Sequence, residues 1–246
     1  MKITVTGQSG RMGQTVIQAI EAEADAQLHS THDQGQDLAS ALARSEGIID
    51  FTLPSLTDEL LKEALAAKVP LVMGTTGHSE EQRTAIAEAA KTIPIVFAPN
   101  FSVGVNTLFW LTRHAARILG NEVFDIEVTE MHHRHKVDAP SGTARGLLEI
   151  LNEETKTSYT DDIDHGRFGE TGPRPQGRIG MHTLRGGDVV GDHTVLFAAD
   201  GERVELTHKA SSRMTFAGGA VRAVLWLKNR APGLYDMQDV LGLREK

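Results

Sequence analysis

A glycine-rich turn between a strand and a helix restricts the fold more than any other feature of this sequence. Residues 2–6 alternate apolar and polar side chains as a strand does, and GQSGRMG follows at residues 7–13. The apolar side chains of residues 14–24 fall on one helical face, and residues 27–32 are expected to form a second strand. The chain therefore begins with a βαβ unit.

The same alternation of strands and helices continues to residue 98. Further strands are expected at residues 48–52, 69–73 and 93–98. The intervening helices are expected around the apolar residues Leu56, Leu60, Leu61, Ala64 and Leu65, and over residues 79–91. Strands that alternate with helices through short loops indicate a parallel sheet with helices on both faces. The predicted fold class is therefore α/β, with a Rossmann-like parallel-sheet domain.

The pattern changes after residue 100, where strands predominate. Strands are expected at residues 124–131, 178–185, 193–198 and 203–208. Residues 159–177 are rich in Asp, Gly, Pro and Arg, and we expect a long loop there, mobile or at an interface. This half predicts a second, α+β domain with a mainly antiparallel sheet.

A last helix, expected over residues 216–229, is predicted to pack back on the first domain. The predicted division assigns dinucleotide binding to residues 1–102, completed by residues 213–246. It assigns substrate binding and oligomerisation to residues 103–212.

The composition excludes several classes of function. The 246 residues include no cysteine, which rules out disulfides, thiolate metal ligands and sulfur nucleophiles. A formal net charge of -8 opposes binding to nucleic acid, which normally needs a basic patch. The sequence has neither a run of eighteen apolar residues nor the pattern of a signal peptide. We therefore expect a cytoplasmic protein with neither a nucleic-acid nor a membrane partner.

The glycine turn can bind a pyrophosphate through backbone amides at the start of the following helix. Its glycines, Gly7, Gly10 and Gly13, are spaced G-x-x-G-x-x-G instead of the usual G-x-G-x-x-G, and they could serve the turn alone. Asp33 lies twenty residues beyond Gly13, where an acidic residue that binds the ribose is expected, although it could also be a solvated loop carboxylate. Gln34 follows it without a nearby basic residue, so NADH is the expected cofactor, with NADPH possible.

Two further loops follow predicted strands. GTTG occupies residues 74–77 and APNF occupies residues 98–101. Both fall at the carboxyl ends of strands, which is the side on which open α/β sheets bind ligands. Each could also be only a turn.

The densest group of polar residues is EMHHRHKVDAPSGT at residues 130–143. Ser141 or Thr143 can cap a helix that begins near Ala144, and the amides around Gly142 can bind an anion with help from the helix dipole. This segment therefore predicts a binding site for a substrate carboxylate.

The same segment offers acid–base groups. Lys136 can bind charge or deliver a proton, and a histidine can act as a general acid near neutral pH. His133 and His135 could instead bind zinc, but the spacing reveals no further ligands. Surface histidines without a function are a third interpretation.

Taken together, these motifs resemble the 4-hydroxy-tetrahydrodipicolinate reductase family, also called dihydrodipicolinate reductase, of the bacterial diaminopimelate and lysine pathway. The resemblance spans nearly the whole chain. It rests on residues 7–13, 74–77, 98–104 and above all 130–143.

The resemblance implies NAD(P)H-dependent reduction of 4-hydroxy-tetrahydrodipicolinate to tetrahydrodipicolinate. It implies that the cofactor contacts Gly7, Gln8, Ser9, Gly10, Arg11, Met12, Asp33, Gly74, Thr75, Thr76, Ala98, Pro99, Asn100 and Phe101.

For the reaction itself, the resemblance makes His132 the proton donor and acceptor and Lys136 the second proton donor. His133, Gly142 and Thr143 would bind the cyclic dicarboxylate. The family implies a homotetramer formed through the sheet of the second domain, and no metal.

The sequence departs from the family at one position. Members that use NADPH well often carry a basic residue directly after the acidic one, where this chain has Gln34.

Two other functions fit the fold: an NAD-dependent sugar or polyol dehydrogenase, and a protein that senses a dinucleotide without turnover.

Overall fold

The computed structural model describes residues 1–244. The chain divides into two units, one made of Met1–Val103 with Arg213–Lys246 and the other of Gly104–Ser212. Among the described residues, no helix combines the length and the apolar character that a membrane span needs.

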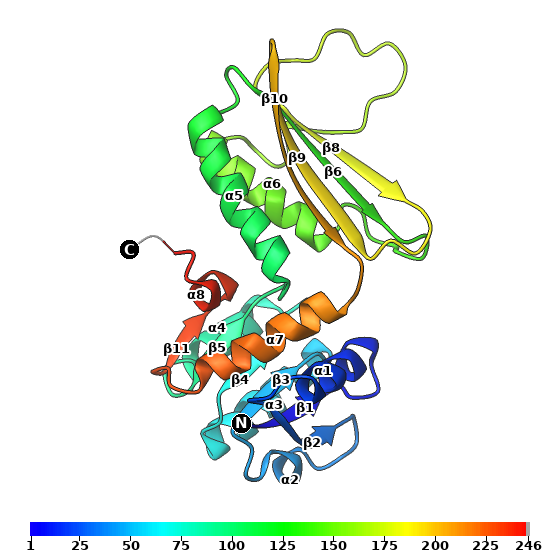
Figure 1. Ribbon diagram of the computed structural model, residues 1–246. Helices are drawn as coiled ribbons and strands as arrows, with labels where there is room; N and C mark the ends of the chain where they lie inside the picture. The colour runs from blue at the N-terminus through cyan, green and yellow to red at the C-terminus, as the bar shows by residue number, and fades with distance from the viewer. Residues whose placement is uncertain (245–246) are drawn as a thin grey trace. The chain divides into compact units, whose positions relative to one another are not determined.

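The first unit is built on a six-stranded parallel sheet in the order β11-β5-β4-β3-β1-β2 (Figure 1). Its strands are β1 Lys2–Thr6, β2 Gln27–His32, β3 Gly47–Asp50, β4 Leu71–Met73, β5 Pro94–Phe97 and β11 Gly233–Tyr235. Strands β3 and β4 are buried at every residue, as expected for parallel strands covered on both faces. The predicted Rossmann-like sheet is thus confirmed.

Helices cover both faces of this sheet. They are α1 Arg11–Glu21, α2 Leu38–Leu42, α3 Thr57–Ala67, α4 Glu80–Ala89, α7 Met214–Leu227 and α8 Met237–Leu241, with a 3-10 turn η1 at Pro54–Leu56. One face buries Ile49 and Val72 against Ile20 of α1 and Val224 of α7. The other face buries apolar residues of α2, α3 and α4. The helix predicted over residues 216–229 corresponds to α7, and it packs on the sheet of the first unit as expected.

The second unit contains a five-stranded sheet in the order β10-β9-β6-β8-β7, of which Figure 1 labels β10, β9, β6 and β8. Its elements are α5 Val103–Leu119, β6 Asp125–His132, α6 Gly142–Thr155, β7 Ile163–His165, β8 Ile179–Arg185, β9 Gly191–Ala199 and β10 Glu202–Ala210. Apolar residues of α5 and α6 pack with alternate residues of the sheet, Ile126 and Val128 among them. The predicted second, sheet-based α+β domain is confirmed.

This sheet is mixed. Strand β9 runs antiparallel to β6 and β10, whereas β8 runs parallel to both β6 and β7. The helix α6 lies between β6 and β8 in the chain, and a helical crossover returns the chain in the same direction. The sequence predicts a mainly antiparallel sheet, and the structure has two antiparallel and two parallel strand pairs. The parallel pairs follow the predicted helix α6 in the chain.

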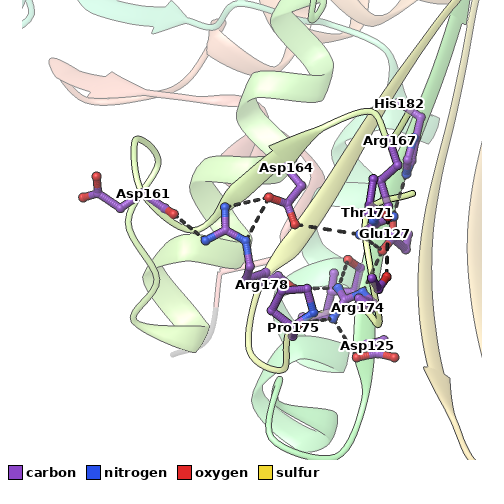
Figure 2. A network of polar contacts seen from close by, with 12 residues as sticks. Asp125, Glu127, Asp161, Asp164, Arg167, Thr171, Arg174, Pro175, Arg178 and His182 are labelled. Carbon is purple, nitrogen blue, oxygen red and sulfur yellow. Dashed lines mark hydrogen bonds and ion pairs between the residues drawn. The ribbon is translucent and has the colours of Figure 1, made fainter. Parts of the chain in front are cut away.

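The predicted loop at residues 159–177 contains the short strand β7, and the rest is held by ion pairs (Figure 2). Arg167 donates to both oxygens of Glu127 at 3.1 and 2.9 Å, and Arg174 donates to Glu127 and Asp125. This ion-pair cluster attaches the loop to strand β6.

Candidate active site

The glycine turn has the backbone that its sequence predicts. Gly7 has a φ of 81°, and a Cβ there would lie 2.6 Å from the carbonyl oxygen of Phe51. A Cβ on Gly13 would lie 2.0 Å from the carbonyl oxygen of Gly7. Only glycine can occupy these two positions, and the close approach leaves the N-terminus of α1 open to an anion. The turn therefore fits a dinucleotide pyrophosphate.

Asp33 lies beside this turn, just beyond the end of β2. Its carboxylate oxygens accept hydrogen bonds from the backbone N–H of Ser9 at 3.3 and 3.2 Å. The fold therefore brings the predicted ribose-binding carboxylate of Asp33 to the glycine turn, although Asp33 and Ser9 are far apart in the sequence.

A buried carboxylate lies beneath the predicted cofactor loops, and sequence reasoning missed it. Asp50, at the end of β3, accepts hydrogen bonds from the hydroxyls of Thr6 and Thr52, both at 2.7 Å, and of Thr75 at 2.6 Å. Burial raises the pKa of Asp50, and this effect exceeds the lowering effect of the three hydrogen bonds. Asp50 ties together the carboxyl ends of β1, β3 and β4. The available signal was an Asp that ends the otherwise apolar strand Gly47–Asp50.

The loops after β4 and β5 lie side by side, because these two strands are neighbours in the sheet. Several of their predicted cofactor residues are buried. Thr75 donates its hydroxyl to Asp50, and the ring of Phe101 packs edge-on to Phe51 at a centroid distance of 5.8 Å. A Cβ on Gly74 would lie 2.1 Å from the Phe51 ring. These side chains shape the loops, so direct contact with a cofactor is left to backbone groups and to exposed residues such as Thr76 and Pro99.

In the second unit, His132 is the last residue of β6 and is paired with a buried carboxylate. Its Nδ1 lies 2.5 Å from Oε2 of Glu130, which is completely buried. Arg185 at the end of β8 donates to both oxygens of Glu130, each at 2.9 Å. Burial alone would raise the pKa of Glu130, but the hydrogen bonds from His132 and Arg185 outweigh it and lower the pKa to about 2. The carboxylate is therefore ionised at neutral pH.

A second histidine packs against the first. His193 of β9 meets the ring of His132 edge-on at a centroid distance of 5.1 Å, and its Nε2 lies 3.2 Å from the hydroxyl of Ser141. Burial, and next the neighbouring His132, lower the pKa of His193 to about 3. His193 is therefore neutral, and sequence reasoning missed it because it lies far from the motif in the chain.

The predicted anion site lies at the start of α6. Ser141 is the N-cap, and its hydroxyl accepts a hydrogen bond from the backbone N–H of Ala144 at 3.2 Å. The helix begins at Gly142, two residues before the predicted start. Gly142 and Thr143 therefore occupy its first turn, where backbone N–H groups point along the axis and the helix dipole favours an anion.

Lys136 and the remaining histidines lie in the loop between β6 and α6. The Lys136 Nζ is 2.8 Å from Oδ1 of Asp138, and the hydrogen bond from Lys136 lowers the pKa of Asp138. The rings of His133 and His135 are 6.2 Å apart between centroids. Within residues 1–244, no group of three or more His, Asp or Glu side chains is arranged to hold a metal ion.

The two units together define a class of protein. The first fits a nicotinamide dinucleotide, and the second combines a carboxylate-bound histidine, a lysine and a helix N-terminus suited to an anion. These features fit the class of dinucleotide-dependent oxidoreductases.

Comparisons with known proteins identify the family within this class. The sequence profile of the dihydrodipicolinate reductase N-terminus matches residues 1–101, and that of its C-terminus matches residues 104–241. A 4-hydroxy-tetrahydrodipicolinate reductase of Akkermansia muciniphila is 63% identical over 245 residues, which cover 100% of this chain and 99% of the relative. The chain belongs to the dihydrodipicolinate reductase family.

Solved structures show the same fold. Dihydrodipicolinate reductase from Paenisporosarcina sp. TG-14, solved with dipicolinate bound, has a TM-score of 0.79 at 22% identity, covering 97% of this chain and 98% of that one. GenD2 of gentamicin A biosynthesis, solved in complex with NAD, has a TM-score of 0.59 at 12% identity, covering 99% and 90%. The chain is accordingly an oxidoreductase whose N-terminal domain binds a nicotinamide dinucleotide.

Proposed function

We propose that the protein catalyses the NAD(P)H-dependent reduction of 4-hydroxy-tetrahydrodipicolinate to tetrahydrodipicolinate in diaminopimelate and lysine biosynthesis. One observation carries the proposal. Glu130 binds both Nδ1 of His132 and the backbone N–H of Ser141, which caps α6, so an acid–base group and an anion site share one network. The chain also belongs to the family that this activity names. The reaction consumes one substrate, one reduced cofactor and one proton, and yields product, oxidised cofactor and water.

The second unit supplies the substrate-binding groups in this proposal. His133, Gly142 and Thr143 bind the carboxylates of the cyclic substrate, with Gly142 and Thr143 in the first turn of α6. Backbone N–H groups and a helix dipole hold a negative charge without needing a cation of their own. This explains how a chain with a net charge of -8 can bind a dicarboxylate.

His132 and Lys136 handle protons. Because Nδ1 of His132 is bonded to Glu130, Nε2 is the ring nitrogen that can exchange a proton with the substrate. Loss of the C4 hydroxyl together with a proton from the adjacent ring carbon gives water and a conjugated imine, whose C4 would accept the hydride that the cofactor supplies. His132 or Lys136 would then return a proton to the adjacent ring carbon. Acid–base help of this kind contributes typically about 10²- to 10⁴-fold in rate.

The first unit supplies the cofactor site in this proposal. When bound, the reduced nicotinamide donates the hydride. Residues 7–12 would hold the pyrophosphate, Asp33 would hold the ribose, and the loops at residues 74–76 and 98–101 would hold the nicotinamide. The acidic Asp33 followed by Gln34 favours NADH over NADPH, since a 2′-phosphate calls for a cation.

We further propose a cytoplasmic homotetramer. The face of the second sheet opposite α5 and α6 carries partly exposed residues such as Glu127, Thr129 and Leu184. A sheet face of this kind can pair with a second copy of itself. Light scattering of the purified protein tests this assembly, and a monomer at micromolar concentration would contradict it.

One assay tests the activity. The protein is mixed with the condensation product of pyruvate and aspartate semialdehyde, and loss of the reduced-cofactor absorbance is followed with NADH and NADPH separately. We expect turnover with both cofactors and a lower KM for NADH. Binding of NADH without its oxidation would contradict the proposal and favour a dinucleotide sensor, and oxidation of polyols in place of this reaction would favour the sugar dehydrogenase alternative.

Two variants test the roles of the proton carriers. His132→Ala and Lys136→Ala should each reduce turnover sharply and leave the dissociation constant of the cofactor near that of the unaltered protein. Loss of cofactor affinity in either variant would assign that residue to the cofactor site instead.

A further inference from the structure

We infer that Glu130 and Arg185 are positioning residues that hold both proposed proton carriers, His132 through its ring nitrogen and Lys136 through the loop at Asp138. The inference rests on the proposed roles of His132 and Lys136. It adds two residues that touch neither the substrate nor the cofactor in the proposed function, yet act through those that do.

The first link runs from Glu130 to His132. The Glu130 carboxylate accepts from Nδ1 of His132 at 2.5 Å, from two nitrogens of Arg185 at 2.9 Å each, and from the backbone N–H of Ser141 at 3.2 Å. A completely buried carboxylate needs such partners to remain ionised. An ionised Glu130 can only accept at Nδ1, so the neutral His132 carries its proton there and presents Nε2 as a base.

The second link runs from Arg185 to Lys136. Besides its two bonds to Glu130, Arg185 donates to the backbone carbonyl of Asp138 at 2.7 Å. The side chain of Asp138 in turn binds Nζ of Lys136 at 2.8 Å. The planar guanidinium can hold the carboxylate and the carbonyl at the same time, because its donors form a rigid fork. The position of Lys136 is therefore tied to the same group that fixes Glu130.

The surroundings make this arrangement specific. The His132 ring faces His193 of β9, which is neutral near physiological pH because burial lowers its pKa to about 3. The charged groups of this network are Glu130 on β6, Arg185 on β8, and Lys136 and Asp138 on the loop before α6. Glu130 is thus the ionised group of this network that contacts the His132 ring, and the contact is made at Nδ1.

The inference is tested with Glu130→Gln, which keeps the size of the side chain and removes its charge. We expect turnover to fall about 10²-fold, the lower end of what acid–base catalysis contributes, with the KM for the cofactor unchanged. Arg185→Lys keeps the charge and loses the fork, so it should reduce turnover about 10-fold.

A second readout separates positioning from stability. In the full-length protein labelled with ¹⁵N at histidine, the ring signals of unaltered His132 at high pH should show protonated Nδ1 and unprotonated Nε2. In Glu130→Gln this preference should weaken. The measurement needs no turnover, so it remains valid if the proposed activity fails, and it can fail while the activity assay succeeds.

Glu127→Gln is the matched control. Glu127 lies on the same strand and also accepts hydrogen bonds from arginines and a histidine, but these partners are Arg167, Arg174 and His182 instead of His132 and Arg185. We expect lower thermal stability with unchanged His132 signals and nearly unchanged turnover. An unaltered protein with neutral His132 protonated at Nε2 would overturn the inference even if Glu130→Gln does not fold. Equal changes in both Gln variants would also overturn it.

Discussion

Two carboxylates on strand β6, three residues apart, form similar clusters with different results. Glu127 and Glu130 each accept hydrogen bonds from arginine and from one histidine, and these bonds lower each pKa to about 2 against the effect of burial. Glu127 lies on the partly exposed face of the sheet, with 17% of its side chain accessible, whereas Glu130 is fully buried. The same residue types therefore occur in two settings.

The two clusters differ in which ring nitrogen of the histidine is bound to the carboxylate. His182 binds Glu127 through Nε2 and is 33% exposed, in a cluster that fastens the loop of Arg167 and Arg174 to the sheet (Figure 2). His132 binds Glu130 through Nδ1, is only 11% exposed, and lies in the same network as the start of α6. The carboxylate–histidine pair at Glu127 therefore helps to hold a loop, whereas the pair at Glu130 leaves Nε2 of His132 for the proton transfer that we propose.

The largest expected difference is in turnover. His132→Ala should reduce turnover about 10²- to 10⁴-fold, the range expected for loss of a general acid or base. His182→Ala removes a histidine from the Glu127 cluster and should change turnover by no more than about threefold, since surface changes away from a site have small effects. Steady-state kinetics of both variants give the comparison. A comparable loss of turnover in the two variants would break it.

Acid stability should depend on both clusters. Each carboxyl has a pKa of about 2 in the folded protein against 4.5 as its ordinary value, so each contributes stability above pH 4.5 that is lost as the pH falls toward 2. The contribution is at most about 3 kcal/mol each. The free energy of unfolding in urea, measured at pH 6 and at pH 3, gives this contribution. Glu127→Gln should show a shallower dependence, and an equally steep one would show that Glu127 contributes little.

A methyl group placed against Nε2 of His132 tests whether this nitrogen takes part in the reaction. A Cβ on Gly191 would lie 3.0 Å from His132 Nε2, so Gly191→Ala should reduce turnover about 10-fold with little change in cofactor binding. Gly186→Ala is the control, because its Cβ would meet only the flexible end of Met131 at 3.2 Å. Turnover in both variants decides the outcome. Full activity of Gly191→Ala would mean that Nε2 has no part in the reaction.

The smallest effect is expected in the loop that the Glu127 cluster holds. Arg167→Gln removes a partly exposed ion pair and should lower the free energy of unfolding by about 1 kcal/mol or less. It should also speed proteolytic cleavage within residues 166–177, while turnover stays unchanged. Limited proteolysis with mass spectrometry measures the cleavage rate. Unchanged cleavage would show that Arg174 alone is sufficient to hold the loop.

Local patterns revealed most of the first unit and the contiguous part of the site. The parallel sheet follows from apolar periodicity, and residues 132–143 are close in space largely because they are close in sequence. Elements as short as α2 and β11, with five and three residues, carry too little periodicity to be predicted. Helix α5 is different, because Val103–Leu119 carries a clear apolar stripe that could have been found.

Partners from distant segments could not be predicted. Arg185 lies 55 residues from Glu130 and His193 lies 52 residues from Ser141, and only strand pairing brings them together. The parallel pairing of β6 with β8 places His132 opposite Arg185, and β9 places His193 opposite Glu130 on the other side. A sequence read segment by segment carries no information on which strands become neighbours.

This pairing has a consequence for how relatives of the chain can vary in length. The segment between β7 and β8 can gain or lose residues without altering the alignment of β8 with β6, because it lies outside the paired region. One residue inserted within β8 would turn Arg185 to the opposite face of the sheet and leave the buried Glu130 without its guanidinium. We therefore expect length differences among active relatives to accumulate in the arginine-rich loop and to be absent from the strand that follows it.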